Sequence, residues 1–281
     1  MSRRRVVRDR LRIRASAGDV KAMLALAQDY DFEVPRNRVS ARRWYKKAAE
    51  ADNVEAQNLY GEILRDGVGG PTKHREAVRC FKLAAQKGHP EAQLSLGYAL
   101  FYGKGITRNR AEAMRWYRKA ARQGEPSAYL NIAQMYRMGD VVEPSWKHAI
   151  RWYTKAAELG DVEAASWLGR IYGGQEDYPE NAAKAAPWLK QAARAGDADS
   201  QCDLGVAYYY GEGVPKSFAQ AAKWYRRAAD QDDGWGAYLL GLCYRDGEGV
   251  KPNKRWARHW FSKASKEGIT EARKALLALR R

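Results

Sequence analysis

The chain has 281 residues, of which 45% are hydrophobic and 30% are charged, a balance typical of a folded, soluble protein. Its formal net charge of +17 favours acidic partners. No apolar run is long enough to cross a bilayer, and three cysteines cannot build a disulfide framework.

The first predicted element is a basic helix over residues 1–20. Residues 1–14 contain seven Arg and one Asp, and they have the charged region of a signal peptide without its apolar core. This predicts a chain that is not exported and a cytoplasmic location. Gly18 lies 34 residues before Asp52, which ends a later helix, so we expect residues 1–20 to form a lone helix that caps a repeat array.

Two amphipathic helices joined by a glycine turn are predicted most clearly over residues 90–124, with Gly103 and Gly105 in the turn. The same pattern recurs at a fixed period of 36 residues. The small residue that marks the first helix falls at Ala56, Ala92, Ala128, Ala164, Ser200, Gly236 and Ala272. The bulky residue of the second helix falls at Trp44, Cys80, Trp116, Trp152, Trp188, Trp224 and Trp260. The first copy begins at Ala22, 34 residues before Ala56, with its two-residue deletion in the turn, and Ala272 belongs to the end of the array. Seven hairpins therefore fill roughly residues 21–268.

The repeated glycines and tryptophans have a packing role in this interpretation. A glycine in the first helix, at Gly61, Gly97, Gly169, Gly205 and Gly241, lets the two helices of a hairpin approach closely. The tryptophans are predicted to form the core. In the fifth repeat Gln175, Asp177 and Tyr178 replace the usual turn residues, and Pro187 lies inside the second helix. We predict that this repeat is the weakest, with a kinked, shortened or displaced helix.

The last predicted element, residues 269–281, is a lone first helix that caps the other end of the array. The predicted fold class is all-α: a right-handed α/α solenoid superhelix of seven 36-residue helical hairpins with capping helices at both ends. The predicted divisions are residues 1–20, 21–268 and 269–281.

The repeat resembles a known family. Its first helix reads A-x-x-x-L-G-x-x-Y, its turn G-x-G-V, and its second helix A-x-x-W-Y-x-K-A-A-x-x-G, with good copies at Ala128–Gly160 and Ser200–Ala229. These motifs resemble the Sel-1-like repeat, a relative of the tetratricopeptide repeat. The resemblance implies a bacterial α-solenoid that binds proteins and catalyses no reaction. Secreted members pair cysteines within each repeat, and that pairing is absent here, which favours a reducing cytoplasm.

Candidate chemistry is sparse. The four histidines, among them His148 and His259, have no partner at metal-ligand spacing. The glycines of residues 67–73 lack the spacing of a phosphate-binding loop. The glutamates that recur before the marker alanine, such as Glu55 and Glu91, suit the first turn of a helix. The sequence therefore predicts no enzyme activity, no metal and no cofactor.

Candidate partner-binding residues lie on the first helices. In tetratricopeptide-like hairpins the first helix lines the concave surface, at positions 2, 3, 6, 9 and 10 after the marker residue. Aromatic, Arg and Met side chains gather at or next to these positions, as in protein-binding hot spots. The predicted residues are Tyr98, Phe101, Tyr102, Gln134, Arg137, Met138, Trp167, Arg170, Tyr209, Tyr210, Trp235, Tyr238 and Arg245. The alternative is that several of them only pack against neighbouring hairpins.

A basic ladder follows the second helices. Arg43, Arg79, Arg115, Arg151 and Lys223 share one position, and Lys47, Lys119, Lys155, Arg227 and Lys263 share the position four residues later. Either these residues form a solvated outer face, or their field attracts acidic partners.

These patterns predict a scaffold or adaptor that binds a protein or peptide, of acidic character, in a concave groove. One alternative is a nucleic-acid-binding solenoid, favoured by a pI near 9.8. Another is an immunity or regulatory protein for a secreted effector.

Overall fold

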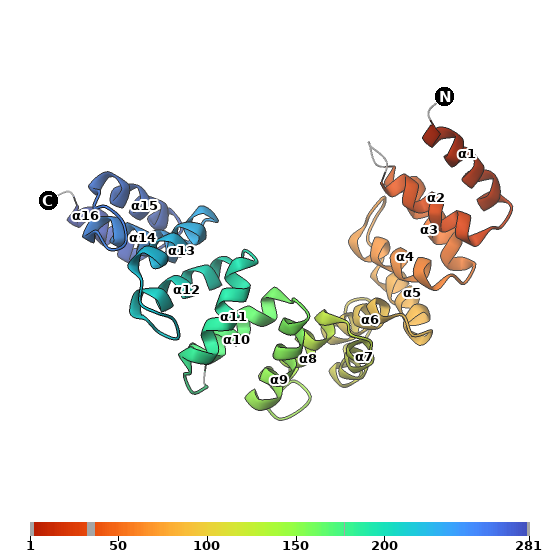
Figure 1. Cartoon of the computed structure of the whole chain (residues 1–281). Helices are drawn as coiled ribbons and strands as arrows, with labels where there is room; N and C mark the ends of the chain where they lie inside the picture. The colour runs from red at the N-terminus through yellow and green to blue at the C-terminus, as the bar shows by residue number, and fades with distance from the viewer. Residues whose placement is uncertain (1–2, 33–36, 177, 280–281) are drawn as a thin grey trace. The chain divides into compact units, whose positions relative to one another are not determined.

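The structure, a computed structural model, describes residues 3–32, 37–176 and 178–279. These described residues form sixteen α-helices and no strand, so the all-α class is confirmed (Figure 1). Parts of three predicted elements lie outside the described residues: residues 1–2 of the first cap, Asp177 of the fifth turn, and residues 280–281 of the last cap. None of the helices in the described ranges is both long and apolar enough to cross a membrane.

The helices are short and regular, and most have 13 residues. Their bounds are α1 Arg3–Ser16, α2 Val20–Asp31, α3 Arg38–Glu50, α4 Val54–Asp66, α5 His74–Gln86, α6 Pro90–Tyr102, α7 Arg110–Arg122 and α8 Pro126–Met138. The remaining ones are α9 Trp146–Glu158, α10 Val162–Tyr172, α11 Ala182–Arg194, α12 Ala198–Tyr210, α13 Phe218–Asp230, α14 Gly234–Asp246, α15 Lys254–Lys266 and α16 Thr270–Ala278. The even-numbered helices α2–α14 are the predicted first helices, and the odd-numbered helices α3–α15 are the second helices.

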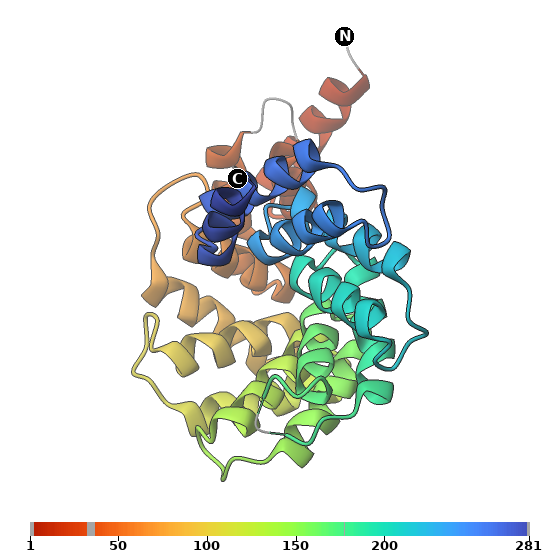
Figure 2. The same ribbon diagram turned by 90° about the vertical axis from the view of Figure 1, so that its left-hand side faces the viewer.

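The chain divides into two compact units, Met1–Ser145 with α1–α8 and Trp146–Arg281 with α9–α16. Within each unit consecutive helices pack side by side in chain order (Figures 1 and 2). In the first unit α2 pairs with α3, α4 with α5 and α6 with α7, while α1 packs on α2. In the second unit α10 pairs with α11, α12 with α13 and α14 with α15, while α16 packs on α15. There α12 also contacts α10 and α14, so the first helices approach one another.

Helix ends follow from the residues beside them. The residue before a first helix is often Asp or Asn, whose side chain accepts a hydrogen bond from a backbone N–H of the first turn, as Asp197 does from Ser200 N at 2.8 Å. At the other end Gly103 adopts φ +74° as a left-handed cap. Gly105 follows with φ +76°, and an added Cβ there would lie 2.5 Å from the His74 carbonyl of the preceding repeat. The two-glycine turn therefore allows one repeat to pack on the next.

The hairpin core centres on the residue after each predicted tryptophan. Tyr117 is 1% exposed, and its ring would lie 2.6 Å from a Cβ added at Gly97. The same pairing joins Gly61 to Phe81, Gly169 to Leu189, Gly205 to Tyr225 and Gly241 to Phe261. The glycine thus provides the space that a large side chain, a ring in four of the five repeats, occupies, as close helix packing predicts.

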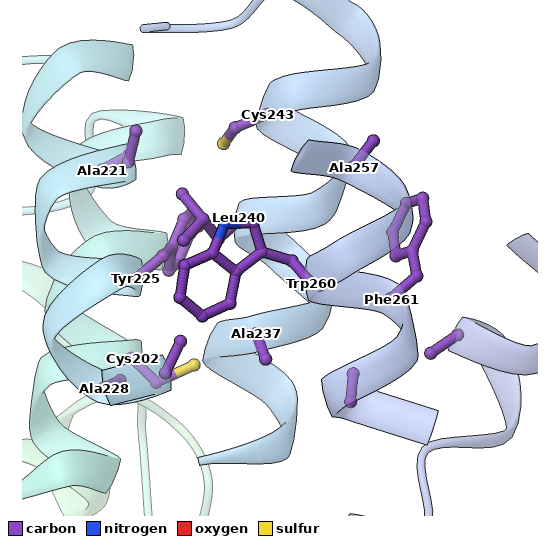
Figure 3. Close-up of a cluster of buried hydrophobic side chains, with 14 residues drawn as sticks. Cys202, Ala221, Tyr225, Ala228, Ala237, Leu240, Cys243, Ala257, Trp260 and Phe261 are labelled. Atoms are coloured by element: carbon purple, nitrogen blue, oxygen red, sulfur yellow. The ribbon is translucent and has the colours of Figure 1, made fainter. Parts of the chain in front are cut away.

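The tryptophans themselves are a partial correction. Trp224 and Trp260 are buried, and Trp260 extends from α15 towards Tyr225 of α13, beside Leu240 of α14 (Figure 3). In contrast, the tryptophans of the earlier repeats are only half-buried, at Trp44, Trp116, Trp152 and Trp188. The residue after each of these tryptophans, such as Tyr117, occupies the centre of the apolar helical face, so the tryptophan lies at the edge of that face. Lys47, Lys119 and Lys155 cover the rings of Trp44, Trp116 and Trp152.

The fifth repeat differs from the prediction in the length and the start of its second helix. Its second helix, α11, contains Pro187 but has 13 residues and begins 36 residues after α9, so it is neither shortened nor displaced. Pro187 lies in the second turn, and both it and Ala183, whose carbonyl loses a hydrogen-bond donor, are exposed. The shortened helix is instead α10, with 11 residues, followed by Gly174 at φ +74°.

The N-terminal arginines bind α2. Arg8 Nε lies 2.5 Å from Asp29 Oδ2, and its guanidinium lies 4.9 Å from the centre of the Tyr30 ring. Arg12 donates to the Tyr30 hydroxyl at 2.5 Å. Part of the basic N-terminal segment therefore holds α1 against α2.

Candidate partner-binding surface

All thirteen predicted residues lie on first helices, six in the first unit and seven in the second. We call the surface formed by the even-numbered helices of each unit its first-helix face. Six of the thirteen side chains are exposed, namely Tyr98, Tyr102, Met138, Tyr210, Trp235 and Arg245. The others are half-buried.

In the first unit an aromatic cluster covers the end of α6. The Tyr98 and Tyr102 ring centres lie 4.5 Å apart, and Phe101 lies 4.9 Å from Tyr102 with the rings edge-on. Lys104 Nζ lies 5.2 Å from the centre of the Tyr98 ring and donates to its hydroxyl at 3.4 Å. Since Tyr102 is 54% exposed, the cluster presents ring surface to solvent.

Beside this cluster lies Arg110, at the start of α7. Its guanidinium lies 5.0 Å from the centre of the Phe101 ring and pairs with the buried carboxylate of Asp140, in the loop after α8. Met138, at the end of α8, is exposed, whereas Gln134 and Arg137 are half-buried. The ion pair fixes the edge of the aromatic cluster.

In the second unit Trp167 and Arg170 of α10 stack on one another at 4.6 Å. Trp167 also stacks on Tyr153 of α9 at 6.1 Å between ring centres, and Arg170 pairs with Glu176 at 3.0 Å. Packing between helices therefore explains part of the burial of Trp167, as the alternative interpretation expects.

Tyr209 and Tyr210 are the last two of the three tyrosines that end α12. Tyr209 donates to Glu248 Oε2 at 2.7 Å, and this bond to a carboxylate raises the pKa of Tyr209 to about 12. Tyr210 lies edge-on to Tyr209, with ring centres 4.9 Å apart, and is 62% exposed. The hydrogen bond to Glu248 thus fixes Tyr209, and the Tyr209 ring supports the exposed ring of Tyr210.

Trp235 and Tyr238 lie on the first turns of α14. Their ring centres are 5.9 Å apart in an edge-on arrangement, and Tyr238 in turn packs on Phe261 at 5.8 Å. Trp235 is 50% exposed. Arg245, at the other end of the helix, makes a bidentate pair with its neighbour Asp246 at 2.7 Å.

A cavity that the sequence analysis missed lies between α10, α12 and α14 in the second unit. Its volume is about 430 Å³. The lining residues are Arg170, Gln175, Asp199, Cys202, Asp203, Val206, Asp233, Trp235 and Leu239. Several occupy the inward positions predicted from the repeat, Asp203 and Leu239 among them. That positional rule could have found the cavity if it had not been restricted to aromatic, Arg and Met side chains.

Burial and charge shape the acidic wall of this cavity. Burial raises the pKa of Asp203 to about 6, against a hydrogen bond from Gln175 that lowers it. Burial also raises the pKa of Asp233, although Asp233 accepts a hydrogen bond from the Gly236 N–H at 2.5 Å. The third carboxylate, Asp199, is exposed and raises both pKa values through its charge. The described residues include no group of three side chains placed to hold a metal ion.

The three cysteines are free thiols. Burial raises the pKa of Cys80 to about 11 and that of Cys243 to about 12, and it also raises the pKa of Cys202. Since the thiolate is the reactive form, these are inert thiols at neutral pH.

The basic ladder of the second helices has two parts. The five cations at the later position each cover a tryptophan ring, at distances to the ring centre of 4.6 Å for Lys47, 4.0 Å for Lys119, 5.3 Å for Lys155, 4.5 Å for Arg227 and 5.7 Å for Lys263. The five cations at the earlier position are all exposed and have no such role: Arg43, Arg79, Arg115, Arg151 and Lys223. The first set is structural, and the second is a solvated surface.

Charge is segregated between the two kinds of helix. The odd-numbered helices hold 34 of the 50 Lys and Arg residues, whereas the even-numbered helices hold seven. α12 has two Asp and neither Lys nor Arg. The net charge of +17 therefore does not describe the first-helix face.

Comparison with known proteins identifies the repeat. The Sel1 repeat family model matches residues 20–53, 54–89, 90–125, 126–161, 162–197, 198–233 and 236–269. No curated protein matches the chain. Among solved structures, a protective antigen present in uropathogenic Escherichia coli strains, which displays an SLR fold, is 31% identical with a TM-score of 0.86. The match covers 97% of this chain but 59% of that protein, so the chain spans less than two thirds of its length.

A Sel1 repeat protein from Oxalobacter formigenes is 29% identical, with a TM-score of 0.74 over 88% of this chain and 99% of that one. An immunity protein from Pseudomonas aeruginosa is 19% identical with a TM-score of 0.42, over 76% and 81% of the two chains, a similarity too low to inform function. The seven predicted repeats and their solenoid family are thus confirmed. The chain belongs to the Sel1 repeat family.

Proposed function

We propose that this Sel1 repeat protein is a non-enzymatic scaffold that binds a protein or peptide partner on its first-helix faces. The observation that carries the proposal is the exposed aromatic surface on these helices. Tyr98, Tyr102, Tyr210 and Trp235 present ring area that the core of the repeat does not need. Exposed aromatic side chains of this kind supply most of the binding energy in protein interfaces.

The surface is suited to binding because its rings are already held in place. Tyr102 contacts both Tyr98 and Phe101, and Tyr210 packs on a Tyr209 whose hydroxyl is bound to Glu248. A side chain that is ordered before binding loses less conformational entropy when the partner arrives. We therefore expect a groove formed in advance rather than one induced by the partner.

The basic second helices would act on encounter with the partner. Their exposed cations create a positive field that attracts an acidic surface and raises the association rate. Nucleic acid is the less favoured partner, because stacking rings and free cations lie mostly on different kinds of helix and would not act on the same strand. A role as an immunity or regulatory protein for a secreted effector would be one setting of the same binding function.

The test is affinity capture from extract of the source cells, with and without nuclease treatment, with the full chain as bait. Tyr98→Ala combined with Tyr102→Ala should lose the captured protein, as should Trp235→Ala if the second unit takes part. The matched control, Arg79→Ala, removes an exposed side chain from a second helix and should leave capture unchanged. Capture that survives all aromatic variants, or that disappears with nuclease alone, would contradict the proposal.

A further inference from the structure

The cavity of the second unit combines an apolar surface with an acidic wall. Trp235, Leu239 and Val206 provide apolar area, and the indole of Trp235 is half exposed at the cavity. Asp199, Asp203 and Asp233 provide the carboxylates. A volume of about 430 Å³ lies within the range of small-ligand sites, roughly 300–1,000 Å³.

The negative charge of this wall is poorly balanced by the protein itself. Of the described residues that line the cavity, one is cationic, Arg170, and it pairs with Glu176 at 3.0 Å and stacks on Trp167. The α12 helix, which carries Asp199 and Asp203, has no Lys or Arg. A chain of net charge +17 therefore keeps an acidic cavity on the face that we propose for binding.

The energetics of Asp203 support the same conclusion. Burial holds the pKa of this carboxyl at about 6, so at neutral pH the ionised form is retained at a cost in free energy. A cation placed in the cavity would lower that pKa and recover part of the cost. The cavity therefore favours a ligand that brings positive charge.

We propose that the cavity binds the side chain of an arginine presented by the protein partner, an inference that rests on the proposed scaffold function. The guanidinium would donate to Asp199 and Asp203 and stack on the indole of Trp235. A planar guanidinium suits both contacts because it forms paired hydrogen bonds with carboxylates and is readily desolvated against an aromatic ring. Charge complementarity therefore predicts that a basic segment of the partner binds in this cavity. A different, acidic part of the partner could still meet the basic second helices.

The experiment uses the full chain labelled with 5-fluorotryptophan and observed by ¹⁹F NMR. The sequence has 10 tryptophans, and Trp235→Phe identifies the signal of Trp235. The probe is Nα-acetyl-L-arginine methylamide, and its neutral counterpart is the citrulline compound of the same shape. We expect the arginine compound to shift the Trp235 signal saturably and the citrulline compound to bind about tenfold more weakly or not at all.

Matched variants locate the charge requirement. Asp199→Asn and Asp203→Asn should each weaken the arginine probe about tenfold, whereas Asp230→Asn, an exposed carboxylate on α13, should have no effect. Unchanged signals from the other tryptophans show that each variant is folded. Any of three results would overturn the proposal. The citrulline compound could bind as tightly as the arginine compound, both Asn variants could bind the arginine compound as tightly as the parent, or the Trp235 signal could show no saturable shift. Tighter binding of free L-arginine or spermidine would also overturn it, since it would indicate a small-molecule site.

The outcome separates this inference from the scaffold function. If the arginine probe fails while Tyr98→Ala with Tyr102→Ala still loses the captured partner, the cavity assignment is wrong and the scaffold stands. If the probe binds but no aromatic variant affects capture, the cavity is real and the aromatic surface is not the main contact.

Discussion

At the scale of single residues, the pairing of one glycine with one ring decides how closely the two helices of a hairpin pack. A Cβ added at Gly205 would lie 2.5 Å from the Tyr225 ring, which is fully buried and cannot move aside. We therefore predict that Gly205→Ala destabilises the protein by about 1–3 kcal/mol, although alanine improves helix propensity by about 1 kcal/mol.

Urea denaturation followed by circular dichroism measures this effect, with Lys223→Ala on the exposed face of α13 as the control, expected within about 0.5 kcal/mol of the parent. In the background of Tyr225→Ala the added methyl group has room, so Gly205→Ala should no longer destabilise. A Gly205→Ala variant as stable as the parent would contradict the role of the glycine.

The buried carboxyl of Asp203 makes a second prediction, on the pH dependence of stability. Its folded-state pKa, about 6, is higher than that of an unfolded aspartate, so the folded state holds the proton more tightly. Stability associated with this group is present at low pH and is lost as pH rises from about 4 to 6. Asp203→Asn removes that loss. The variant should therefore gain stability relative to the parent between these pH values and keep a constant difference above them, as measured by urea denaturation at pH 4, 5, 6 and 7.

At the scale of helices, much of the fold could be predicted and part of the core could not. The 36-residue period places each helix because the apolar face recurs with it, as α6 and α7 show. Periodicity does not distinguish Trp116 from Tyr117, since adjacent residues both lie near the apolar face. The glycine 20 residues earlier decides that Tyr117 is buried, and Lys119 covers the ring of Trp116.

The cavity shows a different limit of sequence reasoning. Its residues come from α10, α12 and α14, so its existence depends on how far apart three helices pack. The repeat gives the direction in which each side chain points but not those distances. Asp203 occupies a predicted inward position, yet a lone Asp on a helix is more often a solvated residue than part of a site.

The fifth repeat supplies a prediction at this scale. α10 is two residues shorter than the other described first helices except α2, and Pro187 removes one backbone hydrogen bond from α11. We expect amides of α10 and α11 to exchange with solvent faster than those of α6 and α7 in the third repeat, because local opening follows the number of stabilising contacts. Hydrogen exchange with mass spectrometry measures this, and Pro187→Ala should slow exchange in α11. If the amides of both repeats exchange equally slowly, other contacts of the fifth repeat fully offset the effects of the proline and of the short helix.

At the scale of the whole molecule, the distribution of charge matters more than its total. The second helices carry most of the Lys and Arg residues, and the first helices carry few, so one chain presents two surfaces of different character. On the proposed function, the second-helix surface would attract a partner over a distance and the first-helix face would hold it. Long-range attraction is screened by salt within about 8–10 Å, whereas buried aromatic contacts are much less sensitive to it.

This separation predicts how variants divide between association and dissociation. Replacing Tyr98 by Ala should cost partner affinity on the order of 1–3 kcal/mol, mainly through faster dissociation, because it removes a contact formed only in the complex. Charge reversal at Arg115 and Arg151, both exposed on second helices, should slow association and have an effect that fades as salt rises. Surface plasmon resonance with the captured partner at low and high salt measures both rates, with circular dichroism to show that helicity is unchanged. The opposite result would be a larger loss of affinity from the charge reversals than from Tyr98→Ala, with affinity that collapses as salt rises. The second helices would then be the binding surface, and the partner would be an acidic surface or nucleic acid. If Tyr98→Ala unfolds the protein, the Tyr98 ring belongs to the core.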